Sequence, residues 1–151
     1  MAKGIGEFCV RNVVTVAREA TVSEAAALMR QYHIGAVLVA DERADGKIPA
    51  GILTDRDIVV EIVAAGLDAT SVKVGELMQR PVTTITESAD YGETVRLMAV
   101  NGVRRMPVVD ARGRLVGIIT VDDILRQLAG PLVALADLAV RERHYETETR
   151  R

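Results

Sequence analysis

The spacing of apolar positions changes in a fixed order along the first part of the chain. It predicts in turn a strand, a helix, two strands and a second helix, at residues 13–16, 22–29, 36–40, 50–53 and 55–65. Thr21 and Glu24 form the pattern of a capping box, in which hydroxyl and carboxylate accept hydrogen bonds from unpaired backbone amides at a helix start. A polar turn is expected at 41–47, and Gly66 ends the second helix.

The same order then occurs a second time. Residues 5–11 resemble 74–80, and residues 51–58, GILTDRDI, resemble 117–124, GIITVDDI. The second copy predicts strands and helices at 82–85, 91–101, 106–109, 115–119 and 121–128, with a turn at 110–113. We therefore divide the chain into repeats at 5–66 and 74–130, joined by a linker at 67–73.

Each repeat has the order β-α-β-β-α. Three strands and two helices have too little apolar surface to close a core by themselves. The sequence therefore predicts an α+β fold in which the two repeats pack through their sheets with pseudo-two-fold symmetry.

An apolar segment follows the second repeat. Pro131 is suited to the first turn of an extra helix, and apolar side chains over 131–140 cover more than one packed face requires. Three interpretations stay open: a dimer contact, a clamp over the core, or simple packing on the same chain. Residues 141–151 are charged and are expected to fray, so 131–151 is interpreted as a C-terminal helix with a charged tail.

Composition excludes several classes of function. The 151 residues are 49% hydrophobic and carry a net charge of −2, with basic residues dispersed and aromatics at 3%, so nucleic acid is not an expected partner. No apolar run is long enough to cross a membrane and no signal peptide precedes the repeats, which indicates a cytoplasmic protein without a membrane partner. Cys9 is the only cysteine, and His33 and His144 lie far apart, so neither a metal site nor catalysis is expected.

The repeated motif carries a family resemblance. Residues 51–57 and 117–123 both read Gly-hydrophobic-hydrophobic-Thr-x-x-Asp, and residues 104–110 read Arg-Arg-Met-Pro-Val-Val-Asp. These segments resemble the cystathionine β-synthase (CBS) domain, and the resemblance covers about residues 5–130. It implies a standalone CBS pair, or Bateman module, that forms a homodimer, requires no cofactor and has no catalytic activity. Such a module binds AMP, ADP or ATP between its repeats and regulates a partner protein of unknown identity.

The resemblance also implies which residues form each cleft. Asp57 would hold the ribose hydroxyls, and arginines would hold phosphate through bidentate hydrogen bonds. The implied first cleft consists of Ile52, Thr54, Arg56, Asp57, Pro81, Val82, Arg104 and Arg105. The implied second and weaker cleft consists of Asn12, Val13, Ile118, Thr120 and Asp123.

The two clefts differ in charge. Gly35 and Ala36 stand in the second cleft where the first has Arg104 and Arg105, and Asp122 stands where the first has Arg56. Hydrogen bonds to charged groups contribute about 1.5–3 kcal/mol each, so losing two or three of them separates the phosphate affinities by orders of magnitude. We expect one phosphate-bearing nucleotide per chain, bound in the first cleft.

Structural interpretations of the same residues stay open. Thr54-x-x-Asp57 and Thr120-x-x-Asp123 are capping patterns in their own right, and capping can coexist with anion binding at a helix start. Arg104 and Arg105 can instead be a solvated pair that provides a polar entry to the buried strand at 106–109. The alternative function is a structural or interaction scaffold that regulates a partner without using its clefts, and an enzyme using Mg²⁺ held by Asp122 and Asp123 is a third possibility.

Overall fold

The computed structural model describes residues 4–78 and 80–149. The first half contains the 3₁₀-helix η1 (Ile5–Glu7), β1 (Thr15–Val16), α1 (Val22–Tyr32), β2 (Ala36–Arg43), β3 (Gly46–Thr54), α2 (Asp55–Ile58) and the π-helix η2 (Val59–Val63). The second half contains α3 (Val74–Leu77), β4 (Ile85–Thr86), α4 (Tyr91–Asn101), β5 (Arg105–Val109), β6 (Leu115–Thr120) and α5 (Val121–Thr149).

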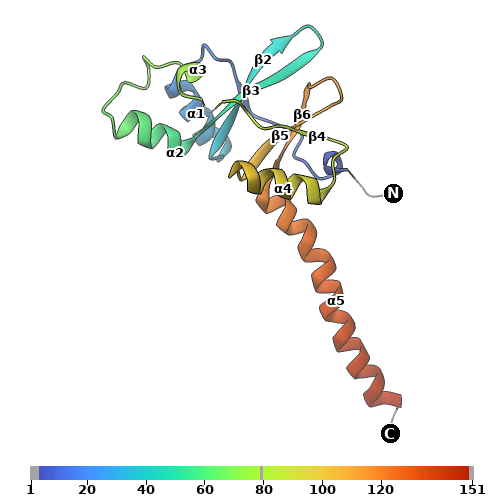
Figure 1. Ribbon diagram of the computed structural model, residues 1–151. Helices are drawn as coiled ribbons and strands as arrows, with labels where there is room; N and C mark the ends of the chain where they lie inside the picture. The colour runs from blue at the N-terminus through green and yellow to red at the C-terminus, as the bar shows by residue number, and fades with distance from the viewer. Residues whose placement is uncertain (1–3, 79, 150–151) are drawn as a thin grey trace.

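Each half builds a three-stranded sheet of the same topology (Figure 1). In the first, β1 pairs in parallel with β2, and β2 pairs antiparallel with β3. In the second, β4, β5 and β6 repeat this order. The predicted α+β architecture of two β-α-β-β-α repeats is confirmed, and the strands β3 and β6 bring the two sheets into contact.

The hairpin of the first half is longer than expected. β2 continues to Arg43 and β3 begins at Gly46, so the turn that we placed at 41–47 is confined to two residues. Gly46 adopts a φ of 145°, which an L side chain rarely adopts, and Lys47 forms an ion pair across the strands with Glu42 at 3.2 Å. These two features allow the strands to pair to their ends.

The two halves exchange their first turns. Ile5, from the start of the first repeat, is fully buried in the core of the second half, against Ile85 and Met106. Val74, from the start of the second repeat, is fully buried in the core of the first half, against Val16 and Leu53. Each repeat therefore completes the other's core.

Backbone hydrogen bonds repeat this exchange on both sides. The Ile5 and Gly6 amides donate to the carbonyls of Ala89 and Glu87, at 2.8 and 2.9 Å. The Val74 and Gly75 amides donate to the carbonyls of Ala20 and Arg18, at the same two distances. A Cβ on Gly6 would lie 2.8 Å from the Glu87 side chain, so this close approach requires glycine.

Arg114 joins the turns of the two hairpins. Its guanidinium donates to Asp110 Oδ2 at 2.7 Å from Nε and to the Asp45 carbonyl at 3.2 Å. Asp110 also accepts the Arg112 and Arg114 amides, so one carboxylate closes the second turn and holds the arginine that reaches the first. This hydrogen bonding lowers the pKa of the Asp110 carboxyl below its usual range.

The C-terminal segment differs from our expectation. We ended one helix at residue 128, began an extra helix at Pro131 and expected a frayed tail after 140, but α5 runs unbroken from Val121 to Thr149. Gly130 does not adopt the left-handed conformation with which Gly102 ends α4, and leucine and alanine on both sides favour helix. The helix continues through Pro131, whose missing N–H costs about 3 kcal/mol inside a helix.

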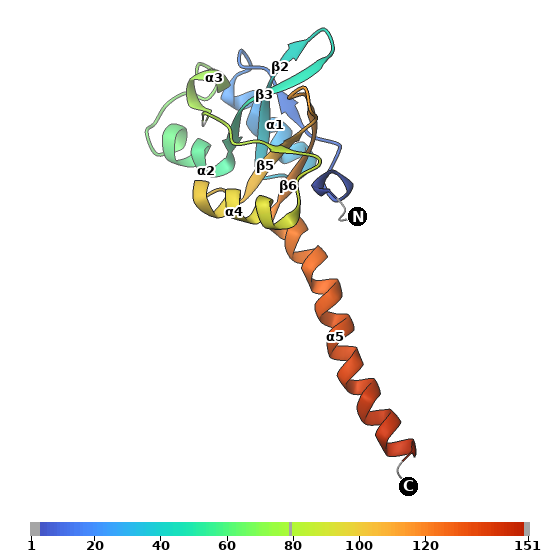
Figure 2. The ribbon, with the colours of Figure 1, turned by 45° about the vertical axis from the view of Figure 1, so that its right-hand side comes forward.

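α5 extends away from both sheets (Figures 1 and 2). Its first turn reaches the second core through Ile124, which is 3% exposed, whereas Leu132 and Leu135 are 65% and 64% exposed. The helix is therefore neither a clamp over the core nor packed along its own chain.

The exchange of first turns predicts a stability cost. Val74→Ala removes two methyl groups from a site with no solvent exposure, and we expect the free energy of unfolding in urea to fall by about 2 kcal/mol. Val100→Ala on α4, where the side chain is 74% exposed, is the matched control and should change it by less than about 0.5 kcal/mol. Equal effects of the two substitutions would contradict the exchanged core.

The Asp110 carboxyl predicts a dependence on pH. Because its pKa is lowered in the folded state, its contribution to stability is present above the unfolded pKa of about 4 and is lost as the pH falls through the folded pKa. The unfolding free energy of the wild type should therefore fall more steeply below about pH 4 than that of Asp110→Asn.

Candidate functional site: a cleft between the two repeats

A cavity of about 440 Å³ lies between the two halves. Three segments line it: the end of β3 with the start of α2, residues 81–83 before β4, and residues 102–105 at the start of β5. All eight residues of the implied first cleft are among its lining residues: Ile52, Thr54, Arg56, Asp57, Pro81, Val82, Arg104 and Arg105. The fold therefore brings residues from both repeats around one space.

Four further residues line this cavity that we did not identify from the sequence: Asp55, Thr83, Gly102 and Val103. Each lies within two residues in the chain of a residue that we did identify. The family resemblance implied single positions, whereas a cavity is lined by short segments.

Thr54 and Asp57 form a complete capping box at the start of α2. The Asp57 amide donates to Thr54 Oγ1 at 3.1 Å, and the Thr54 amide donates to Asp57 Oδ2 at 2.9 Å. The capping interpretation is thus confirmed for this pair. Both side chains also line the cavity, and the capping hydrogen bonds hold them in position there.

Three guanidinium groups give the cavity a positive excess. Arg56, Arg104 and Arg105 line it, against two carboxylates, Asp55 and Asp57. Arg56 and Arg104 are exposed and Arg105 is half-buried. Within residues 4–78 and 80–149, none of the three guanidinium groups forms an ion pair. Arginines without an acidic partner are available to bind an anion through charge-assisted hydrogen bonds.

The second half repeats the capping box. The Thr120 amide donates to Asp123 Oδ2 at 2.9 Å, and the Asp123 amide donates to Thr120 Oγ1 at 3.3 Å. Arg126 lies 3.9 Å from the Asp123 carboxylate. This pair starts α5 as Thr54 and Asp57 start α2, and here an arginine of the same helix faces the carboxylate.

A second, smaller cavity of about 220 Å³ is lined by Arg11, Val13, Thr15, Lys47, Leu115 and Val116. It includes Val13 of the implied second cleft, and that cleft as a ligand site stays a prediction. Its two cations already have partners. Lys47 donates to Thr15 Oγ1 at 2.8 Å, and Arg11 donates to the Gly6 carbonyl at 2.9 Å.

The N-terminal segment covers this side of β6. Val10 and Ile118 exchange two backbone hydrogen bonds of 2.9 Å, and Cys9 packs over Gly117. Burial raises the pKa of the Cys9 thiol, which favours the neutral form. Ile118 therefore pairs with the chain's own backbone at this edge.

Comparison with known proteins identifies the family. The model of the CBS domain matches residues 5–64 and 74–130, which is most of the chain. The chain belongs to the CBS-domain family. It is 39% identical over 116 residues to hypoxic response protein 1 of Mycobacterium tuberculosis, covering 77% of this chain and 78% of that protein. It is 38% identical over 122 residues to an uncharacterized protein of Methanopyrus kandleri, where it covers 81% of this chain but 61% of the relative.

Solved structures of CBS proteins share the fold. A structure of hypoxic response protein 1 with two coordinated zinc ions has a TM-score of 0.72 at 35% identity, covering 82% of this chain and 97% of that one. The cytosolic domain of the Mg²⁺ channel MgtE in complex with ATP has a TM-score of 0.69 at 33% identity, covering 82% and 48%. A hexameric CBS-CP12 protein from cyanobacteria has a TM-score of 0.70 at 33% identity, covering 81% and 69%.

Two further features are absent from the part of this CBS pair that the structure describes. Among residues 4–78 and 80–149, no group of three or more His, Cys, Asp or Glu side chains is arranged to hold a metal ion. No helix in that part of the chain is long and apolar enough to cross a membrane.

The packing over Gly117 predicts opposite effects for two Gly→Ala substitutions. A Cβ at Gly117 would lie 2.5 Å from Cys9 Sγ and 2.9 Å from the Val10 carbonyl, so Gly117→Ala must displace this segment and should cost about 1–3 kcal/mol of stability. Gly130 has no neighbour within 4 Å and lies inside α5, so Gly130→Ala should instead stabilise, by up to about 1 kcal/mol. Chemical unfolding of both variants measures the two signs, and a neutral Gly117→Ala would contradict the close packing.

Proposed function

We propose that this CBS pair is a regulatory module that binds one adenosine nucleotide, of the AMP, ADP or ATP type, in the cleft lined by Asp57, Arg104 and Arg105, and that it has no catalysis of its own. The observation that carries the proposal is the cavity between the repeats. It joins three unpaired guanidinium groups to a carboxylate held at a helix start.

The residue types suit the parts of a nucleotide. Pro81, Val82 and Ile52 provide apolar surface for a base, and the arginines provide bidentate donors for phosphate. The Asp57 carboxylate, which already caps α2, has the acceptor chemistry that ribose hydroxyls require, because an ionised carboxylate offers two oxygens with several acceptor sites. A volume of about 440 Å³ lies in the ordinary range of about 300–1,000 Å³ for small-molecule pockets. The MgtE domain, which is similar in fold, was solved with ATP.

The same cleft offers a route by which nucleotide binding can be transmitted to a partner protein. Its lining comes from both repeats, so a ligand that contacts Asp57 and Arg104 together links the two halves. Arg104 also accepts the amide of Val121, the first residue of α5, on its carbonyl at 2.9 Å. A nucleotide that orders residues 104–105 therefore acts on the start of the projecting helix, where a partner protein can sense the change.

Isothermal titration calorimetry with AMP, ADP and ATP tests the proposal. We expect one site per chain for the best ligand. Arg105→Ala should weaken binding by about 10–100-fold, because a hydrogen bond to a charged group contributes about 1.5–3 kcal/mol. Arg112→Ala removes an equal charge at an exposed position in the 110–113 turn and should leave the affinity unchanged.

Two further outcomes would change the assignment. Two equal nucleotide sites per chain would contradict the asymmetry between the clefts. Absence of heat and of any thermal stabilisation with all three nucleotides would instead favour the scaffold that regulates a partner without using its clefts. Hydrolysis of ATP by the protein in the calorimeter cell would contradict the non-catalytic assignment.

A further inference from the structure

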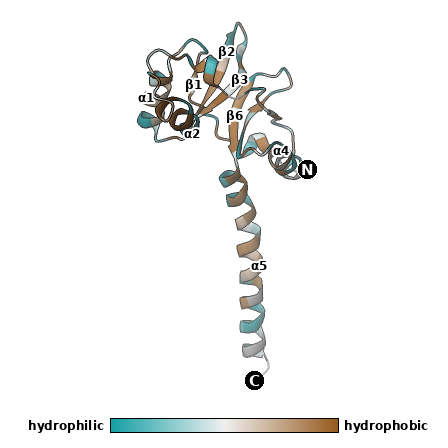
Figure 3. Cartoon of the chain, turned by 60° about the vertical axis from the view of Figure 1, so that its left-hand side comes forward, coloured by the Kyte–Doolittle hydropathy of each residue, from teal (hydrophilic) through white to brown (hydrophobic). Residues whose placement is uncertain are grey.

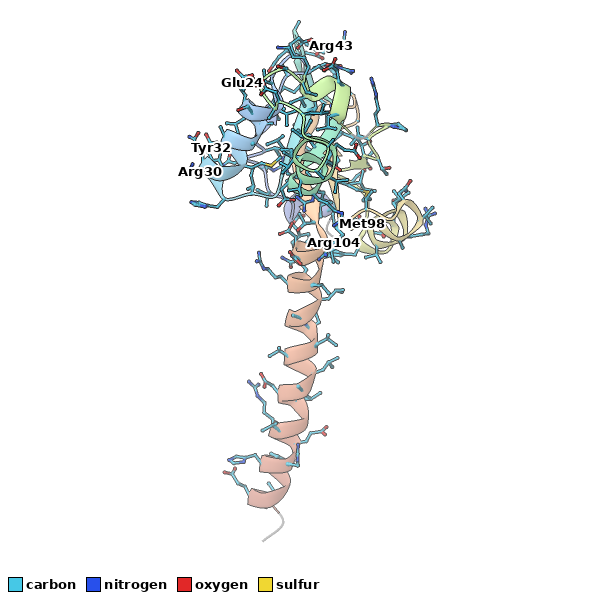
Figure 4. The ribbon with its side chains drawn as sticks, turned by 90° about the vertical axis from the view of Figure 1, so that its left-hand side faces the viewer. Glu24, Arg30, Tyr32, Arg43, Met98 and Arg104 are labelled. Atoms are coloured by element: carbon cyan, nitrogen blue, oxygen red, sulfur yellow. The ribbon has the colours of Figure 1, made fainter. Side chains whose placement is uncertain are left out.

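The free part of α5 carries an uncovered apolar surface. Beyond the first turn its large apolar side chains are between 46% and 65% exposed: Leu125, Leu128, Leu132, Val133, Leu135, Leu138 and Val140. Figure 3 shows hydrophobic positions along most of the projecting helix, and Figure 4 shows its side chains extending free of the rest of the chain. Contiguous exposed apolar patches of this kind mark interaction sites in soluble proteins.

Four of these residues form a regular stripe, which we call the leucine seam: Leu125, Leu128, Leu132 and Leu135. Their spacing of three, four and three residues is that of the a and d positions of a coiled coil. Helical periodicity places Ile124 on the same side, and Ile124 is buried in the second core. The seam is thus a continuation of a stripe that begins as core packing and leaves the domain uncovered.

The helix needs this surface covered. Helices gain most of their stability in proteins from packing of an apolar face, and an isolated helix is marginal in water. Here Gly130 and Pro131 weaken the helix at the centre of the seam. The chain's own described residues provide no packing there, so the packing must come from another molecule.

We propose that the leucine seam pairs with the leucine seam of a second copy of this chain, so that the protein self-associates through α5. A coiled-coil seam is self-complementary, since each knob fits between four residues of an equivalent helix. The four seam leucines are each between 46% and 65% exposed, so a second copy seated on the seam would remove a continuous apolar stripe from water. This contact begins at the end of the second repeat, with Leu125 and Leu128, and continues beyond it with Leu132 and Leu135. It does not depend on nucleotide binding.

The charges of α5 favour a protein over a membrane surface. The face opposite the seam carries Asp123, Arg126, Asp137 and Arg141, two acids and two bases. Helices that lie on anionic membranes instead carry a polar face rich in lysine and arginine.

The oligomeric mass of the full chain tests the proposal. By sedimentation equilibrium we expect a dimer or larger assembly, and Leu132→Asp or Leu135→Asp should raise the dissociation constant by at least about tenfold, because a buried charge opposes the seam. Ala134→Asp, on the opposite face of the same turn, should keep the wild-type mass. A wild type that stays monomeric at the highest concentration, or seam variants with unchanged mass, would overturn the proposal.

Cysteine cross-linking provides a second readout that needs no disruptive substitution. In a Cys9→Ser background, single cysteines at Leu128, Leu132 and Leu135 should give covalent dimers under mild oxidation, and one at Ala134 should give few. Parallel helices would cross-link at all three seam positions, whereas antiparallel helices would cross-link only near the two-fold axis. Equal yields at seam and control positions, or a monomer that co-sediments with vesicles of phosphatidylcholine and phosphatidylglycerol, would overturn self-pairing.

Discussion

The exchange of first turns is the interaction on which the rest of this structure depends. Ile5 fills the core of the second half and Val74 fills the core of the first, so neither repeat has a complete core without the other. Matching backbone hydrogen bonds anchor each turn against the other repeat. Because the two anchors lie in different cores, they set how the repeats face one another, and with it the width of the cleft between them.

The two repeats share one backbone arrangement but differ in the side chains that it carries. At the starts of α2 and α5 a threonine and an aspartate form the same capping box. The residue after each threonine donates its amide to an equivalent carbonyl at 2.9 Å, Asp55 to Gly35 and Val121 to Arg104. The two sites differ in the side chains that the loops carry. Arg104 in one copy and Gly35 in the other occupy the same backbone position, so the difference in charge between the two copies comes from a few substitutions on one backbone arrangement.

The start of α5 is where these features meet. Val121 bonds to the cleft loop, Ile124 packs in the second core, and the leucine seam begins at the next residue. Figure 4 shows Arg104 close to this junction. A change in the loop therefore has a short covalent and hydrogen-bonded path to the only described helix that extends beyond the domain.

The sequence by itself determined the order of elements and the repeat, and its resemblance to the CBS family implied the membership of the first cleft. Alternating and helical spacings report which side chains share one face of a short segment, which is why α4 lies at the predicted residues 91–101. The repeat of 51–57 at 117–123 indicated which positions are equivalent, and the eight first-cleft residues do surround one cavity. Their role toward a nucleotide stays a prediction. Tertiary structure alone decided that Ile5 and Val74 cross over, that N-terminal backbone pairs with Ile118, and that α5 continues through Pro131. Those outcomes depend on which distant segments cover which apolar surfaces. The spacing of residues within one segment carries no information about that choice.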